Sequence, residues 1–160
     1  MGDINQLCSV LNSICTLFDR LLVVENNKLD AIAINDVDML DEYMRAEQAF
    51  TMELRGLDAR REKILEDLGL SGLTMSTIIE RYSGEDRTKL SVIFEKLQER
   101  TEEIQVAVAC TKRFIELHLQ SLDLVLDRMG EQKAVDASYV QTGEKKDDLD
   151  EVMRFATRKV

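Results

Sequence analysis

Residues 84–129 read GEDRTKLSVIFEKLQERTEEIQVAVACTKRFIELHLQSLDLVLDRM, and this stretch decides the fold. Its apolar residues return every three or four positions, a spacing typical of a helix that packs along one face. They are Leu90, Ile93, Leu97, Ile104, Val108, Ile115, Leu122, Val125 and Met129. Glu85 and Asp86 place negative charge in the first turn, and Gly130 is a residue that commonly follows the last one. The stretch therefore predicts a helix of more than 40 residues, roughly 60 Å long.

Two further apolar stripes precede this stretch. The first runs through Ile4, Leu7, Leu11, Ile14, Phe18, Leu21, Leu22, Leu29 and Ile32, and Asn35-Asp36 interrupts it with residues that favour turns and helix starts. The second runs through Val37, Leu40, Met44, Phe50, Leu54, Leu57, Ile64 and Leu68, and ends at Gly69. Glu47 and Arg61 fall where this stripe calls for apolar residues, so we expect looser packing there. A brief helix carrying Ile78 and Ile79 follows Thr74 as N-cap, before a break at Ser83-Gly84.

Composition supports an all-helical protein. The chain has 160 residues, the size of about one domain. It contains no proline, the residue that breaks helices, where average usage predicts about eight. We therefore predict an all-α fold: an antiparallel bundle of three long helices, like a coiled-coil hairpin, with a short extra helix, spanning residues 1–130. A C-terminal amphipathic helix follows a linker.

Charge excludes several classes of partner. The formal net charge is −10, and an acidic surface repels nucleic acid and anionic lipid. No stretch approaches the roughly 20 apolar residues of a membrane span, and the first residues lack a secretion signal, so we expect no membrane insertion. The expected location is the cytoplasm.

The sequence offers no site for catalysis, a metal or a cofactor. Cys8, Cys15 and Cys110 are spaced too far from one another and from His118 for one zinc ion, and we predict small buried thiols. His118 lies on the apolar seam between Ile115 and Leu122, as a satisfied and partly buried imidazole would. A histidine phosphotransfer module is the alternative for this residue, although the Lys and Gly typical of such sites do not follow it. We predict a protein without enzymatic activity.

The last 30 residues differ in character from the rest of the chain. Residues 131–143 are polar and small, with Tyr139 as an aromatic anchor, and predict a linker. Residues 144–160 predict an amphipathic helix with a narrow apolar stripe, which we call the C-terminal stripe: Leu149, Val152, Met153 and Ala156. A helix of about a dozen residues is marginal alone in water, so its stripe should contact something. Two alternatives are that this tail folds back on the bundle or stays unstructured.

This layout resembles the FlgN family. The resemblance rests on Glu25-Asn26-Asn27-Lys28-Leu29 near the end of the first helix, on Asp36, Asp38 and Leu40 at the turn, on Arg61 followed by Leu68-Gly69-Leu70 at the end of the second helix, and on Tyr139-Val140-Gln141-Thr142-Gly143 after the third. The likeness covers residues 4–143. Two departures are Arg45-Ala46-Glu47, where the family typically has a Lys, and Cys110-Thr111-Lys112-Arg113, where it often has Asn residues.

The resemblance implies a cytoplasmic flagellar export chaperone of the type III secretion system. Such chaperones hold the C-terminal helix of hook-filament junction (hook-associated) proteins and deliver them to the export gate protein FlhA. By this resemblance, Tyr139 would dock on the gate, and the segment after it would bind substrate. The residues favour the same division, because a flexible, methionine-containing stripe suits an amphipathic partner helix.

A structural protein is the second hypothesis. It is a non-enzymatic coiled-coil assembly protein that self-associates through the C-terminal stripe. A chaperone waiting for its substrate should instead be a monomer or a weak homodimer at low concentration.

Overall fold

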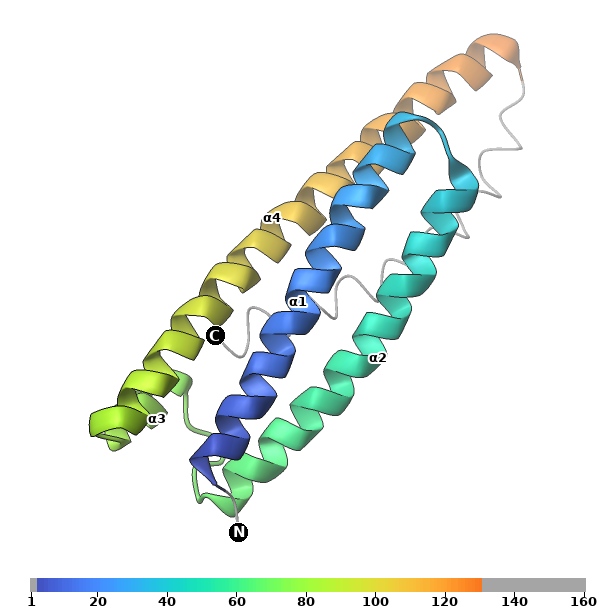
Figure 1. Ribbon diagram of the computed structural model, residues 1–160. Helices are drawn as coiled ribbons and strands as arrows, with labels where there is room; N and C mark the ends of the chain where they lie inside the picture. Colours follow the sequence, from blue (N-terminus) through green and yellow to red (C-terminus); the bar gives the residue numbers. More distant parts are fainter. Residues whose placement is uncertain (1–2, 131–160) are drawn as a thin grey trace.

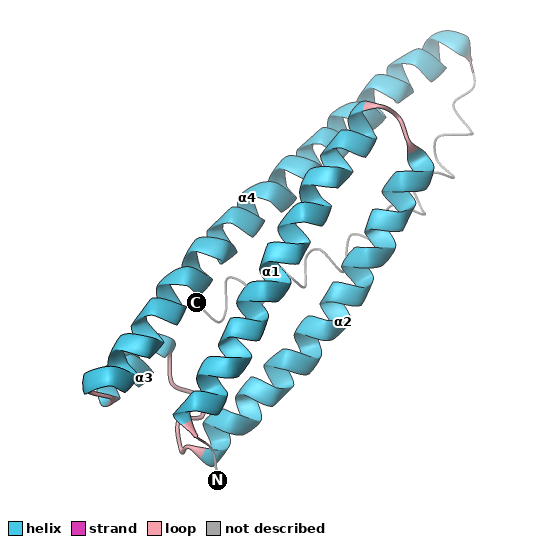
Figure 2. Ribbon diagram, viewed as in Figure 1, coloured by secondary structure: helices cyan, strands magenta, loops and turns pink. Residues whose placement is uncertain are grey.

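The computed structural model describes residues 3–130, and these confirm the predicted all-α fold. Three long helices, α1 (Ile4–Ala33), α2 (Val37–Asp67) and α4 (Gly84–Met129), are accompanied by the short α3 (Met75–Arg81). Figure 2 shows only helices and loops in this part of the chain. The predicted linker and C-terminal helix lie outside the described residues.

The helix ends form where the sequence predicts them. Asp36 caps α2 by accepting a hydrogen bond from the backbone N–H of Met39, at 3.0 Å. Thr74 caps α3 in the same way. Gly130 follows α4 with a φ of 75°, in the left-handed region that glycine adopts without a steric penalty.

The long helices form a layer with α1 in the middle. As Figure 1 shows, α1 and α4 run in the same direction and α2 runs against both. α1 packs along its length against α2 on one side and α4 on the other, whereas α2 and α4 do not pack along their lengths against each other. α3 packs on α4, at the end of the molecule where α1 and α4 begin. The three long helices are therefore packed, but they do not close into a ring.

The core follows the predicted stripes. α1 contributes most of it, with Leu7, Leu11, Ile14, Phe18 and Leu21 fully buried, and α4 adds Leu90, Leu97, Ile104 and Val108. The cluster continues through Leu54, Ile64 and Leu65 of α2 into Met75 and Ile78 of α3. One hydrophobic core thus joins all four described helices.

The hydropathy of α1 corrects one sequence expectation. By length and composition this helix could cross a membrane, because one 18-residue window has a mean hydropathy of 1.7 and few charges. Half of that window is buried inside the molecule, as in the core helix of a folded domain. The run of apolar residues is explained by its central place, where two helices pack against it.

α4 is longer than the helices beside it. His118 Nε2 lies 2.5 Å from the side-chain oxygen of Asn35, in the turn after α1. Residues 119–129 extend past this point by about 16 Å. The sequence pattern predicts that the apolar residues of this extension belong to the core, and for two of them this is wrong. Leu122 exposes 46% of its surface and Met129 exposes 67%.

Candidate functional site

The residues that sequence reasoning selects as sites cannot be placed in the fold. Tyr139 and the C-terminal stripe (Leu149, Val152, Met153 and Ala156) lie outside the described residues. The described helices instead bring together a group of charges whose contact the sequence did not predict.

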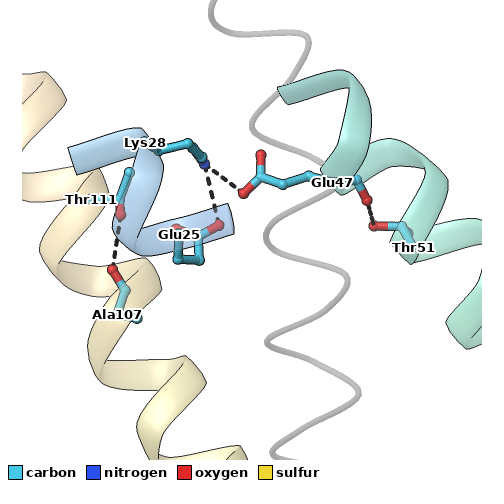
Figure 3. Close-up of polar contacts among 6 residues, drawn as sticks. All are labelled: Glu25, Lys28, Glu47, Thr51, Ala107 and Thr111. Atoms are coloured by element: carbon cyan, nitrogen blue, oxygen red, sulfur yellow. Dashed lines mark hydrogen bonds and ion pairs between the residues drawn. The ribbon is translucent and has the colours of Figure 1, made fainter. Parts of the chain in front are cut away.

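A buried charge cluster, formed by Glu25, Lys28 and Glu47, joins α1 to α2. The Lys28 Nζ lies 3.3 Å from Glu25 Oε1, one turn away on the same helix, and 2.5 Å from Glu47 Oε1 on α2. Figure 3 shows the three side chains turned toward one another, with Thr111 of α4 alongside. Glu25 and Lys28 are fully buried, and Glu47 exposes only 4% of its surface.

Two carboxyl groups surround one ammonium, so one negative charge would be buried without a countercharge if both acids were ionised. Burial, together with the hydrogen bond that protonated Glu47 donates to Glu25 and the negative charge of Glu25, raises the pKa of Glu47 to about 9, against the lowering effect of Lys28. At neutral pH Glu47 therefore keeps its proton, and its carbonyl oxygen still accepts a hydrogen bond from the Lys28 ammonium. A neutral acid costs less to bury than a second carboxylate would.

The surroundings of the cluster are polar but not reactive. The Thr51 and Thr111 hydroxyls donate to backbone carbonyl oxygens one turn earlier on their own helices, those of Glu47 and Ala107. Glu25 Oε2 is buried and has no hydrogen-bond partner among the described residues. Within residues 3–130 no group of His, Cys, Asp and Glu side chains is arranged to hold a metal ion. The cluster thus fits a structural role, in which buried charges favour one pairing of α1 with α2.

A pattern in the sequence could have revealed the cluster. Glu25 and Lys28 continue the buried stripe of α1, seven residues after Phe18 and Leu21. Glu47 falls at an apolar position of the second stripe, so opposite charges occupy core positions on two neighbouring helices. The looser packing expected there is wrong, because both Glu47 and Arg61 are buried and paired.

Arg61 is the second buried cation of α2. Its guanidinium donates to Asp58 Oδ1 from Nε at 3.0 Å and from Nη2 at 2.9 Å, and it also contacts Glu62. All three residues belong to one helix, so these contacts neutralise Arg61 locally while its stem packs in the interface.

The cysteine predictions are partly right. Cys8 and Cys15 are buried on α1, and burial raises the pKa of both thiols, so they are poorly reactive. Cys110 is exposed, because it lies on the side of α4 that faces away from α1. His118 is half-buried against Asn35, as the sequence predicts, and this contact fits a positioned imidazole rather than an accessible phosphate acceptor.

Comparisons with known proteins give one match. The family described as FlgN protein matches residues 1–147, which cover nearly the whole chain. A search of curated proteins and a search of solved structures each find no match.

Proposed function

The chain belongs to the FlgN family, and from this membership we propose which segments of it hold an export substrate and which reach the export gate. FlgN proteins are cytoplasmic flagellar export chaperones that have no enzymatic activity and bind hook-associated export substrates. The family match over residues 1–147 is the observation that carries the proposal.

The proposed substrate is the C-terminal helix of a hook-filament junction protein. Its apolar face would pack on the C-terminal stripe, of which Val152 and Met153 form the centre. A helix that folds only on its partner needs such an apolar surface. The net charge of −10 supports this role, because it keeps a protein with an apolar docking segment in solution.

The proposed second contact is between Tyr139 and the export gate protein FlhA. A tyrosine combines a large apolar ring with a hydroxyl, which makes it a common anchor in protein interfaces. Its distance from the stripe along the chain separates the two contacts. The chaperone can then hold its substrate while it docks on the gate.

Co-purification tests this division of labour. Hook-associated proteins from the native cytosol should be retained by the parent chain and by Tyr139→Ala, but lost with Met153→Asp. Purified FlhA cytoplasmic domain should show the reverse dependence, with Tyr139→Phe as the matched control that keeps the ring. Equal loss of both partners in Tyr139→Ala would refute the separation of the two sites.

The end of α4 favours self-association as a second candidate. Leu122, Val125 and Met129 are exposed along the extension beyond the α1–α2 turn. If two chains pair through this extension, light scattering at increasing concentration should show a dimer that Leu122→Asp abolishes. A monomer throughout the concentration range would exclude this candidate.

A further inference from the structure

One side of α1 is fully buried although its neighbours do not meet over it. We define this third face by Ile14, Phe18, Leu21, Glu25 and Lys28, which recur every three or four residues and so share one side of the helix. Each of them exposes 1% of its surface or less. The opposite side of α1 is exposed, and it carries Asp19 and Arg20.

Contacts of Asp19 and Arg20 locate the two flanking helices. Arg20 reaches α2, where it pairs with Glu53 at 3.1 Å and lies over the ring of Phe50. Asp19 reaches α4, where its Oδ1 lies 2.5 Å from Arg100 Nε. α2 and α4 therefore flank α1 on either side of its exposed strip, and the third face lies behind, between them. Because α2 and α4 do not pack along their lengths against each other, their backbones do not close over this face.

α3 is too short, and lies too far from Lys28, to cover the whole third face of α1. Its seven residues span about 10 Å, and it lies at the end of the molecule where α1 begins. Lys28 follows Ile4, the first residue of α1, by about 36 Å along the helix axis. The upper half of the third face, from Phe18 to Lys28, needs another element.

We propose that the C-terminal stripe of this same chain packs on the third face of α1, between α2 and α4, when no substrate is bound. The lengths agree. Thr111 lies beside the charge cluster and Gly130 follows it by about 29 Å along α4, while residues 131–148 can span up to about 60 Å. If residues 149–160 form a helix on this face, it would extend about 18 Å, which matches the roughly 15 Å from Lys28 to Phe18.

Charges on α2 are complementary to those of the tail. Asp58 and Glu62 project from the flank of α2 that faces away from Phe50 and Glu53, on the side of the third face. The polar positions of residues 149–160 include three cations, Arg154, Arg158 and Lys159, and two anions, Asp150 and Glu151, so the segment carries one net positive charge with its cations toward the C-terminal end. Asp58, Glu62 and their partner Arg61 together leave one net negative charge beside the apolar face, which would attract these cations and favour one orientation of the tail.

The docked tail would regulate substrate binding. This consequence rests on the proposed function, because only a substrate that binds the C-terminal stripe has to compete with α1 for it. In the empty chaperone the C-terminal stripe would be buried against α1. A substrate helix that binds the stripe would displace the tail from α1 and so make Lys28 accessible to solvent. The accessibility of Lys28 in the charge cluster would then report whether the tail is docked on α1 or bound to substrate.

Amine labelling of the full-length chain tests this docking directly. Lys28 is acetylated by N-hydroxysuccinimide acetate only when its Nζ is accessible, and mass spectrometry reads its rate. We expect Lys28 to react at least tenfold faster in Met153→Asp than in the parent chain, and at the parental rate in Glu151→Gln, a matched change on the polar side of the tail. The exposed Lys63 and Lys89 should react alike in all three chains. An equally slow Lys28 in Met153→Asp would overturn the proposal.

Two further measurements distinguish loss of docking from unfolding, and failure of the docking from failure of the proposed function. The buried Cys15 should stay unreactive toward a thiol reagent in Met153→Asp, and if it reacts, the milder Met153→Ala is used, in which Lys28 should still react faster than in the parent. Purified hook-associated protein added to the parent chain should also accelerate Lys28. If Met153→Asp exposes Lys28 but the hook-associated protein fails to bind the parent chain, the docking holds and the proposed function fails. Binding without a change at Lys28 would contradict the competition.

Discussion

Glu47 lies 2.5 Å from Lys28 across the contact between α1 and α2 and keeps its proton at neutral pH. In the unfolded chain the same group loses its proton near its usual pKa of 4.5, whereas in the folded protein this happens near 9. The folded state binds more protons between these values. The free energy of unfolding therefore falls as the pH rises from about 5 to about 9.

Substitution of Glu47 by Gln should remove this pH dependence. Glutamine keeps an oxygen that accepts from Lys28 and cannot ionise. We expect Glu47→Gln to match the parent chain near pH 5 and to exceed it at pH 8 by about 1–3 kcal/mol, measured by urea unfolding. Glu42→Gln, at an exposed position of the same helix, is the control and should leave the slope unchanged. A parental slope in Glu47→Gln would show that another group titrates.

Lys28 should be the least replaceable residue of the cluster. Lys28→Met keeps the length of the stem but leaves Glu25 and Glu47 buried without a cation. Loss of one partner of a buried ion pair costs about 3–5 kcal/mol, so we expect a large fall in the unfolding midpoint at pH 7. The double variant Lys28→Met/Glu47→Gln should recover more stability than Glu47→Gln gains in the parent chain at the same pH, because Lys28 favours Glu47 in the parent. A recovery equal to that gain would mean that the two residues are not coupled.

At the scale of elements, the helix ends were predictable and the packing partners were not. Asp36, Thr74 and Gly130 act within one turn of chain, so local chemistry reveals them. The depth at which a stripe is buried depends on what lies opposite it. Leu122 and Met129 repeat the pattern of Leu97 and Ile104, yet only the latter meet α1, because α1 ends first. The charge cluster escaped prediction for the same reason, since it depends on two helices coming together.

Two glycines of the long helices should respond in opposite ways to alanine. Gly130 has a φ of 75°, so Gly130→Ala forces a side chain into the left-handed region and should cost about 1 kcal/mol. Gly56 lies inside α2 with open space around its Cα, so Gly56→Ala should stabilise by about 0.5–1 kcal/mol. Thermal unfolding of both variants checks this pair. The same sign in both would contradict the assigned helix end.

At the scale of the whole molecule, one central helix organises the fold. α1 is the shared core of two helix pairs, one with α2 and one with α4. The fold class and the family followed from the sequence, because periodicity, turn residues and motif order are local signals. Which segment covers the third face of α1 could not follow from those signals, since it depends on a contact between distant parts of the chain.

Substrate binding by the C-terminal stripe is the central claim, and isothermal titration with a purified hook-associated protein tests it most directly. We expect Val152→Asp to weaken binding by at least about tenfold, because a charge at the centre of an apolar contact costs about 2 kcal/mol or more. Glu151→Gln, the neighbouring polar residue, should bind like the parent chain. Parental affinity in Val152→Asp would contradict the claim.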